Sequence, residues 1–239
     1  MSVVQLERIG ALCRVTIDRP SKANALDAAL VEALLDVVAN AASDGTRLLA
    51  IRANGKNFSA GFDFSGFEEC TGADLLWRFI RIEQLLQAVH HAPFATAAFA
   101  QGKNFGAAAD LFMACQARIT TADATFRMPG LLFGIQLGTR RLAARIGADA
   151  ARAMLAESRK VTGVECLPMA FATRLAAQDE WAAIEQQLLA TACALEPMAA
   201  QRLQRATLAD TRANDLADLV ASATEGDLKE RIRRYRLRG

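Results

Sequence analysis

Phe94-Ala95-Thr96-Ala97-Ala98-Phe99-Ala100 is an apolar run that leads through Gln101-Gly102-Lys103-Asn104 into a helical segment from Gly106 to Cys115. A short apolar run that ends at turn residues predicts a buried strand. The helix opens with Gly106 and three alanines, whose small side chains leave the first backbone amides barely covered. Free amides and the helix dipole suit such an end to holding an oxyanion. This strand, turn and helix indicate an α/β protein with a candidate anion site at the start of the helix.

The first half of the chain repeats this alternation of strand and helix. Apolar runs predict strands at residues 11–17, 47–53 and 118–121, and helical spacing of apolar residues predicts helices at 25–41 and 74–90. Repeated strand–helix–strand units favour right-handed crossovers and a largely parallel sheet. Beyond Gly138 the strand signals fade and helical patterns dominate. The sequence therefore predicts an α/β core over residues 1–190 and a helical C-terminal part over 191–239.

The composition favours a folded protein with one main domain. The chain has 239 residues, of which 52% are hydrophobic and 23% are charged, so a sizeable core can form. A net charge of +2 gives no argument for a nucleic-acid partner. The basic residues between Lys229 and Arg238 suit either a solvated helical tail or contacts with a phosphate-bearing ligand.

The cysteines and the apolar stretches bear on the compartment. Five widely spaced cysteines without a C-x-x-C pair indicate neither a disulfide framework nor a metal site, and they favour reduced thiols in a cytoplasmic protein. The first residues lack the basic and apolar regions of a signal peptide. The stretch from Ala92 to Ala109 contains Pro93 and Lys103, which argue against a membrane span. We expect no metal and no membrane partner.

Asp110 lies one turn into the helix that begins at Gly106, among apolar neighbours. A carboxylate is costly to bury there unless it is hydrogen-bonded or serves a purpose. Burial would raise its pKa and allow it to move protons near neutral pH. The alternative is that Asp110 only complements the positive end of the helix dipole. The residues by themselves support both interpretations equally.

Two further segments follow predicted strands. In Lys56-Asn57-Phe58-Ser59-Ala60-Gly61-Phe62-Asp63-Phe64, the small residues allow the backbone to approach a ligand closely, although an ordinary tight loop would look the same. Asp63 is a candidate second acid, but in such a loop an aspartate is more typical of a turn or cap. On the helix at 74–90, Trp77 and Phe79 fit core packing or the wall of a pocket. The segment from Ala124 to Gly134 predicts a strand, a turn and a loop, with no chemistry assigned.

Taken in order, five segments of the chain resemble the crotonase family, also called the enoyl-CoA hydratase/isomerase family. Residues from Asp18 to Leu26 are similar to the family's N-R-P-x-x-x-N-A-L segment, and those from Phe58 to Asp63 to its F-x-A-G-x-D loop. Two later segments, Asp123 to Phe126 and Gly138 to Leu142, also match. Residues from Glu225 to Glu230 are similar to the acidic-Gly start of its last helix. The resemblance implies a crotonase-like ββα spiral core, a C-terminal trimerisation region over 191–239, and a homotrimer or hexamer.

The resemblance also implies roles for particular residues. The backbone amides of Phe62 and Ala107 would hold the carbonyl oxygen of an acyl-CoA thioester, and Asp110 aligns with the first of the two catalytic glutamates of hydratases. The positions that would contact the substrate are Lys22, Ala23, Ala25, Ser59, Ala60, Gly61, Gly106 and Lys229. CoA enters as part of the substrate, so no separate cofactor is expected.

The chain departs from the family pattern where the second glutamate would stand. Pro129 is followed by Gly130, so that carboxylate is absent, and the loop between Gly134 and Gly138 is short. Hydration is helped by two carboxylates, whereas moving a double bond from the 3- to the 2-position needs one base. The sequence therefore favours double-bond isomerisation. The alternatives are a hydratase, another enolate reaction such as decarboxylation or hydrolysis, an enzyme that acts on carrier-protein-bound acyl groups, and a non-catalytic acyl-CoA-binding protein.

Overall fold

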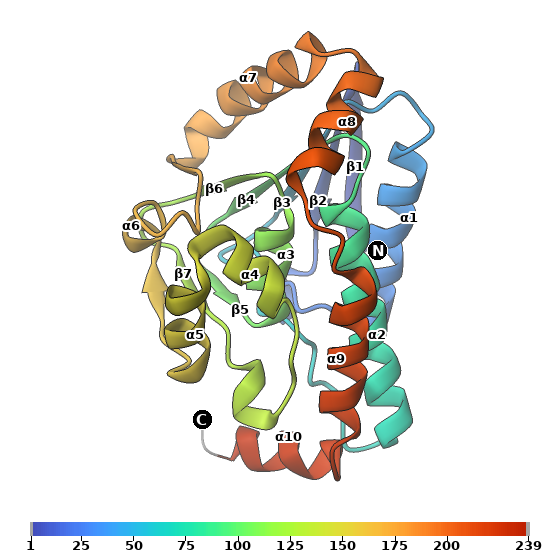
Figure 1. Ribbon diagram of the computed structural model, residues 1–239, viewed down its shortest axis with the longest axis vertical. Helices are drawn as coiled ribbons and strands as arrows, with labels where there is room; N and C mark the ends of the chain where they lie inside the picture. Colours follow the sequence, from blue (N-terminus) through green and yellow to red (C-terminus); the bar gives the residue numbers. More distant parts are fainter. Residues whose placement is uncertain (1, 238–239) are drawn as a thin grey trace.

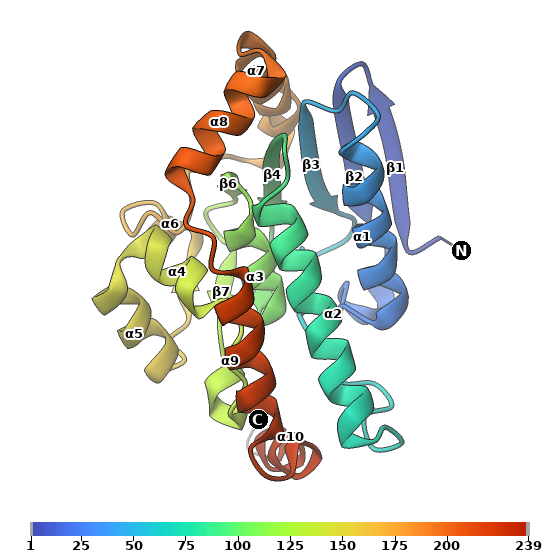
Figure 2. The same cartoon turned by 45° about the vertical axis from the view of Figure 1, so that its right-hand side comes forward.

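The computed structural model describes residues 2–237, which form a six-stranded sheet, a three-stranded sheet and the helices packed around them (Figures 1 and 2). The strands are β1 Val4–Ile9, β2 Leu12–Ile17, β3 Leu48–Ala53, β4 Ala95–Ala100, β5 Lys103–Phe105, β6 Ala117–Thr120, β7 Thr125–Arg127, β8 Val161–Thr162 and β9 Arg174–Leu175. The α-helices are α1 Ala28–Ala41, α2 Gly72–His90, α3 Ala107–Ala114, α4 Thr139–Ile146, α5 Ala148–Ala156, α6 Gly163–Cys166, α7 Trp181–Ala194, α8 Pro197–Thr207, α9 Arg212–Thr224 and α10 Leu228–Arg236. Three short 3-10 helices are η1 Pro20–Lys22, η2 Gly130–Phe133 and η3 Gln178–Glu180.

The larger sheet has the strand order β1-β2-β3-β4-β6-β9. Every neighbouring pair from β2 to β9 is parallel, which confirms the predicted largely parallel sheet. Strand β1 pairs antiparallel with β2 at the edge and was not predicted. Five of its six residues are exposed, so this strand lacks the buried apolar face on which a sequence pattern depends.

Both faces of the central strands are covered, which explains why these strands read as continuous apolar runs. Cys13, Val15 and Ile17 of β2 belong to the main core, which also includes the buried sides of α1 and α2. Leu12 and the opposite-facing residues of β3 and β4 pack on the other side against Trp181 of α7. Figure 2 shows α1 and α2 side by side along the sheet. The period of two along each strand sorts the side chains between these two layers.

The C-terminal part returns to the core of its own chain. Helix α9 packs along α2, and α10 lies beside η2 at one end of the molecule (Figure 1). Helix α7 runs from Trp181 to Ala194, so the predicted division between residues 190 and 191 falls inside a helix. Trimerisation by residues 191–239 stays a prediction. Within the described residues, no helix combines the length and apolar character needed to cross a membrane.

A buried glutamate joins α7 to the sheet. The Glu185 carboxylate is fully buried and accepts hydrogen bonds from Arg14, at 3.0 Å from Nε and 2.6 Å from a terminal guanidinium nitrogen. Arg52 of β3 forms a second ion pair with the same carboxylate. One carboxylate therefore compensates two partly buried cations, and losing it would leave both without their buried partner.

We expect Glu185→Ala to lower the free energy of unfolding by about 3–5 kcal/mol, because uncompensated buried charge is strongly destabilising. Urea titration followed by circular dichroism measures the effect. Glu225→Ala is the matched control, since Glu225 is exposed and has no side-chain bond in the part of the chain that the structure describes. The control should stay within about 0.5 kcal/mol of the original protein. Equal stability of the two variants would contradict the role given to Glu185.

Candidate active site

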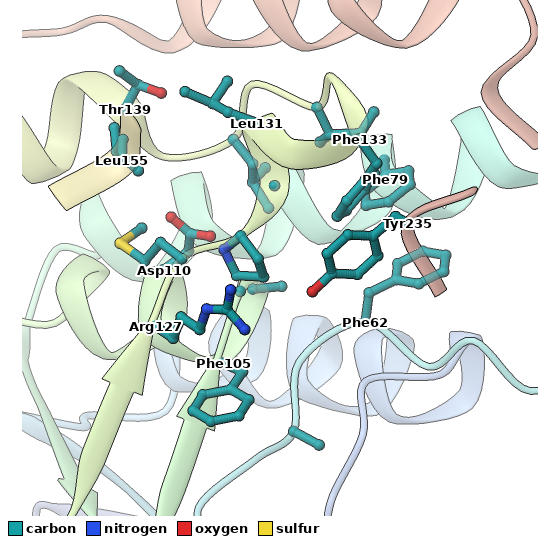
Figure 3. Close-up of a pocket in the computed structure, with 18 of the residues that line it drawn as sticks. Phe62, Phe79, Phe105, Asp110, Arg127, Leu131, Phe133, Thr139, Leu155 and Tyr235 are labelled. Atoms are coloured by element: carbon teal, nitrogen blue, oxygen red, sulfur yellow. The ribbon is translucent and has the colours of Figure 1, made fainter. Parts of the chain in front are cut away.

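A cavity of about 220 Å³ lies where α3, β5 and β7 meet η2 and the end of α10 (Figure 3). Its walls are mainly apolar, and four side chains bring polar or charged groups: Asp110, Arg127, Thr139 and Tyr235. The other lining residues are Ala60, Phe62, Phe64, Phe79, Phe105, Gly106, Ala107, Met128, Pro129, Gly130, Leu131, Phe133, Ile135, Leu137 and Leu155. A concave apolar site with a few converging polar groups is the usual form of a small-molecule site.

Helix α3 presents its first amide to this cavity. Gly106 precedes the helix with φ 53° and ψ −124°, a conformation that favours glycine, and its N–H donates to the Arg127 carbonyl at 2.7 Å. This bond fixes the start of the helix on β7. The Ala107 N–H that follows has no acceptor among the described residues and borders the cavity. The helix start that the sequence suggested as an anion site therefore carries an unpaired amide at its N-terminus.

The loop that carries Phe62 packs directly against this helix start. A Cβ at Gly61 would lie 2.1 Å from the Phe105 carbonyl oxygen and 3.4 Å from the Ala107 nitrogen, so a glycine is required for the contact. Gly61 also has φ +85°, which disfavours other residues. The next amide, that of Phe62, has no acceptor among residues 2–237. Close packing at Gly61 thus brings two unpaired amides to the same cavity, the arrangement that holds an oxyanion.

Local hydrogen bonds hold the loop in this place. The buried Ser59 hydroxyl donates to the Asn24 carbonyl at 2.7 Å and accepts from the Gly61 N–H at 3.1 Å. The Ala60 N–H donates to the Ala23 carbonyl at 2.9 Å. Leu26 in turn donates to the Gly61 carbonyl at 2.7 Å. The segment at residues 23–26 therefore acts as a frame against which the loop is fixed.

Asp110 reaches the cavity from the first turn of α3 and is 4% exposed. Its Oδ1 atom has no hydrogen-bond partner in the described part of the chain. Burial raises the pKa of the Asp110 carboxyl well above its ordinary value, the Arg141 charge opposes this rise, and Glu83 adds to it. A Cβ at Gly138 would lie 1.9 Å from Oδ1, so the absence of a side chain there makes room for the carboxyl. Asp110 is a buried acid whose proton is available to a ligand.

Arg141 does not neutralise Asp110 because its charge is shared with other carboxylates. Its guanidinium is buried and donates to Glu83 at 2.9 Å and to Asp215 at 3.2 Å. Two ion pairs with α2 and α9 thus hold the cation, and desolvation dominates at Asp110. No sequence pattern indicated this cluster, because Glu83, Arg141 and Asp215 come from three helices far apart in the chain.

The place of the second family carboxylate is closed. A Cβ at Gly130 would lie 2.8 Å from the carbonyl oxygen of Ile135, so a longer side chain does not fit this backbone. Asp63, the other candidate acid, does not line the cavity. Burial alone would raise the pKa of Asp63, but hydrogen bonds from Ser65 and the Arg19 charge outweigh it and lower that pKa. Within the described residues, Asp110 is the one carboxylate on the cavity wall.

The structure brings five of the predicted site residues together and leaves six outside the cavity wall. Those that line the cavity are Ala60, Phe62, Gly106, Ala107 and Asp110. Those that do not line it are Lys22, Ala23, Ala25, Ser59, Gly61 and Lys229. Lys22 lies exposed directly before the loop frame, and the Lys229 amine donates to the Glu68 carbonyl oxygen. Arg238 of the predicted basic tail lies outside the described residues.

Sequence reasoning missed Arg127 and Tyr235 and underestimated Phe79. Phe79 stacks on Phe62 with ring centroids 4.3 Å apart and lines the cavity, whereas Trp77 is 57% exposed. Tyr235 comes from the far end of the chain and packs on Phe133 at 4.9 Å. The one signal for Arg127 was an arginine within an otherwise apolar stretch, and the signal for Tyr235 was that it is the chain's one tyrosine.

The α/β core thus brings two unpaired backbone amides and a buried acid to one cavity. The family model for enoyl-CoA hydratase/isomerase matches residues 7–228, and the chain belongs to this family of enzymes. A protein named probable enoyl-CoA hydratase echA6 from Mycobacterium leprae is 32% identical over 198 residues, which cover 80% of this chain and 76% of that protein.

Solved structures agree with this assignment. A structure described as an enoyl-CoA hydratase/isomerase from Bordetella parapertussis is 44% identical, with a TM-score of 0.97 and 98% of each chain covered. An enoyl-CoA hydratase from Bacillus halodurans shares the fold at 19% identity, with a TM-score of 0.86 over 98% of this chain and 100% of that one. The predicted crotonase-like fold is therefore confirmed.

We expect Gly61→Ala to lower kcat with enoyl-CoA substrates by about 10²- to 10³-fold, the usual cost of losing one oxyanion donor. The added methyl group would push the loop, and with it the Phe62 amide, away from the Phe105 carbonyl. Gly45→Ala is the control, because Gly45 has φ +86° and a Cβ added there would have no described atom within 4 Å. Both variants carry the same backbone strain, so equal rates in the two would contradict the role given to the close contact at Gly61.

Proposed function

We propose that the protein moves the double bond of an acyl-CoA thioester from the 3- to the 2-position through an enolate. The observation that carries the proposal is Asp110, the one carboxylate on the described cavity wall, beside two unpaired amides. Isomerisation needs one base that takes a proton from C2 and returns it at C4. The family assignment supports acyl-CoA as the substrate class.

In this proposal the thioester oxygen binds between the amides of Phe62 and Ala107. Negative charge gathers on that oxygen when the C2 proton leaves, and fixed donors in a dry site stabilise it without reorganising. Asp110 takes the proton from C2 and donates it to C4, so the double bond shifts into conjugation with the carbonyl. Burial raises the pKa of Asp110, which makes its carboxylate a stronger base than that of an exposed aspartate.

A hydratase is the second candidate, and it has the support of the relatives' names. Hydration would need another group to activate water, and Gly130 offers neither a carboxylate nor room for one. A decarboxylase, a hydrolase or a non-catalytic acyl-CoA binder would use the same two amides. One acid in an apolar cavity supports isomerisation above these.

For the CoA portion we propose the surface beside the loop frame. The Ala23 carbonyl oxygen accepts one hydrogen bond within the described residues, from the Ala60 N–H, and keeps a second lone pair for an adenine amino group. The Ala25 carbonyl already accepts from both the Asp27 N–H and Arg19, so Ala23 is the acceptor in this proposal. Lys22 lies beside this segment and can meet phosphate. To bind the CoA phosphates of its own subunit, Lys229 would have to break its hydrogen bond to the Glu68 carbonyl. In the proposed trimer it would instead contact the CoA of a neighbouring subunit.

We expect Asp110→Asn to lower the isomerisation rate of 3-enoyl-CoA by about 10²- to 10⁴-fold, the usual contribution of a general base. Asn keeps the shape of the side chain but cannot take a proton. Absorbance of the conjugated product measures the rate, and calorimetry should show CoA-ester binding within about threefold of the original protein. A variant that keeps the full rate would show that another group is the base. Faster hydration of 2-enoyl-CoA than isomerisation in the original protein would favour the hydratase.

The pH dependence of the rate and of stability should have opposite signs at Asp110. The base works when ionised, so kcat should fall as the pH drops through its raised pKa. Stability contributed by a neutral buried carboxyl is complete below the unfolded pKa of about 3.9 and is lost as the pH rises through the folded pKa. Asp110→Asn should therefore melt at the same temperature as the original near pH 4 and at a higher one in alkaline buffer. A lower melting temperature throughout would contradict the raised pKa.

A further inference from the structure

Arg127 brings a positive charge into the cavity from strand β7. Its side chain is half-buried, and its Nε donates to both the carbonyl and the hydroxyl oxygen of Ser158, each at 3.0 Å. Ser158 is buried and has φ +47°, so a constrained turn supplies both acceptors. The two terminal nitrogens have no bond to the described residues. Hydrogen bonds from Nε thus hold the arginine side chain in place, and its two terminal guanidinium nitrogens remain free among the described residues.

No carboxylate lies within 4.0 Å of Arg127 in residues 2–237, whereas its neighbours around the site are compensated. Arg141 pairs with Glu83 and Asp215, and Arg19 pairs with Asp27 and Asp63. No anion among the described residues offsets the charge of the half-buried Arg127, and its terminal nitrogens make no hydrogen bond there. The charge of Arg127 is therefore available to a ligand that enters the cavity.

A second free polar group faces the same space. Figure 3 shows the Arg127 guanidinium and the Tyr235 hydroxyl both pointing into the cavity from different walls, with Phe105 below and Asp110 beside them. The Tyr235 hydroxyl has no partner in the described part of the chain. A guanidinium fork and a hydroxyl together match the oxygens of a carboxylate, which a guanidinium binds with two parallel hydrogen bonds.

We propose that the substrate's acyl group carries a carboxylate and that Arg127, assisted by Tyr235, binds it. The inference rests on the proposed function and narrows its substrate to carboxyacyl-CoA thioesters. Arg127 accepts through its carbonyl the hydrogen bond of Gly106, the residue before the oxyanion amide of Ala107. Arg127 lines the same cavity as Ala107 and Asp110, whereas Lys22 and Lys229 do not line it.

The test is calorimetric binding of three matched pairs of CoA esters, each pair with the same number of acyl carbons: malonyl- and propionyl-CoA, glutaryl- and pentanoyl-CoA, and adipoyl- and hexanoyl-CoA. In at least one pair, the original protein should bind the carboxylated ester about 10- to 100-fold more tightly, as expected for hydrogen bonds to a charged group. Arg127→Met should remove that preference and keep the affinity for the uncharged ester. Arg127→Lys should recover only part of it, because an ammonium lacks the planar fork.

Arg145→Met is the matched control. Arg145 is also half-buried and has no carboxylate partner among the described residues, but it lines a different cavity, between the sheet and helices α7 and α8. The control should keep the preference for carboxylated esters. The proposal is overturned if no pair shows a preference in the original protein, or if the preference survives in Arg127→Met.

Free CoA separates two sources of negative charge. If Arg127→Met weakens CoA and all of its esters equally, Arg127 serves the CoA phosphates and the proposal is wrong. Isomerisation of uncharged 3-hexenoyl-CoA and of its carboxylated counterpart 3-hexenedioyl-CoA, measured in parallel, tests the proposed function independently. Turnover without a carboxylate preference would overturn this inference alone, a preference without turnover would overturn the isomerase alone, and failure to bind any ester would overturn both.

Discussion

The contact between Gly61 and the Phe105 carbonyl is the constraint on which the site depends. It lets the loop after β3 touch the start of α3, and only a residue without a side chain fits there. The two segments come from consecutive crossovers of a parallel sheet, whose strand ends meet at one edge. Two amides that no strand or helix uses therefore face one cavity. Their donors belong to the backbone, which explains how alanine can occupy position 107 without loss of the donor.

Beside these amides the protein buries the Asp110 carboxyl, which costs folding free energy because the group loses its hydration. Gly138 leaves room for the Asp110 carboxyl, and Arg141 is held by Glu83 and Asp215 instead of pairing with it. An aspartate with a free cation at this point would be a weak base, because a nearby positive charge lowers a carboxyl pKa. The ion-pair cluster between α2, α4 and α9 thus has two effects. It joins three helices, and it leaves burial as the main influence on the pKa of Asp110.

The end of the chain completes the cavity. Helix α10 buries Leu228 and Ile232 in the core and places Tyr235 against Phe133. Its ion pair between Arg233 and Glu68 is partly exposed, and such pairs contribute little to stability. Apolar burial therefore holds α10 in place. One wall of the site consequently depends on a segment that lies more than a hundred residues beyond Asp110 and α3.

Local periodicity in the sequence predicted the order of the main strands and helices. The resemblance of its short motifs to a known family implied the two amide positions and the missing carboxylate at Gly130. The sequence did not reveal β1, whose exposed faces carry no apolar pattern. The folded chain shows what no sequence pattern indicated: Asp63 is ion-paired outside the cavity, Phe79 and Tyr235 line it, and Arg127 enters it without an anion among the described residues. Each of these depends on which distant segments meet, and a pattern read along one chain does not contain the distances between them.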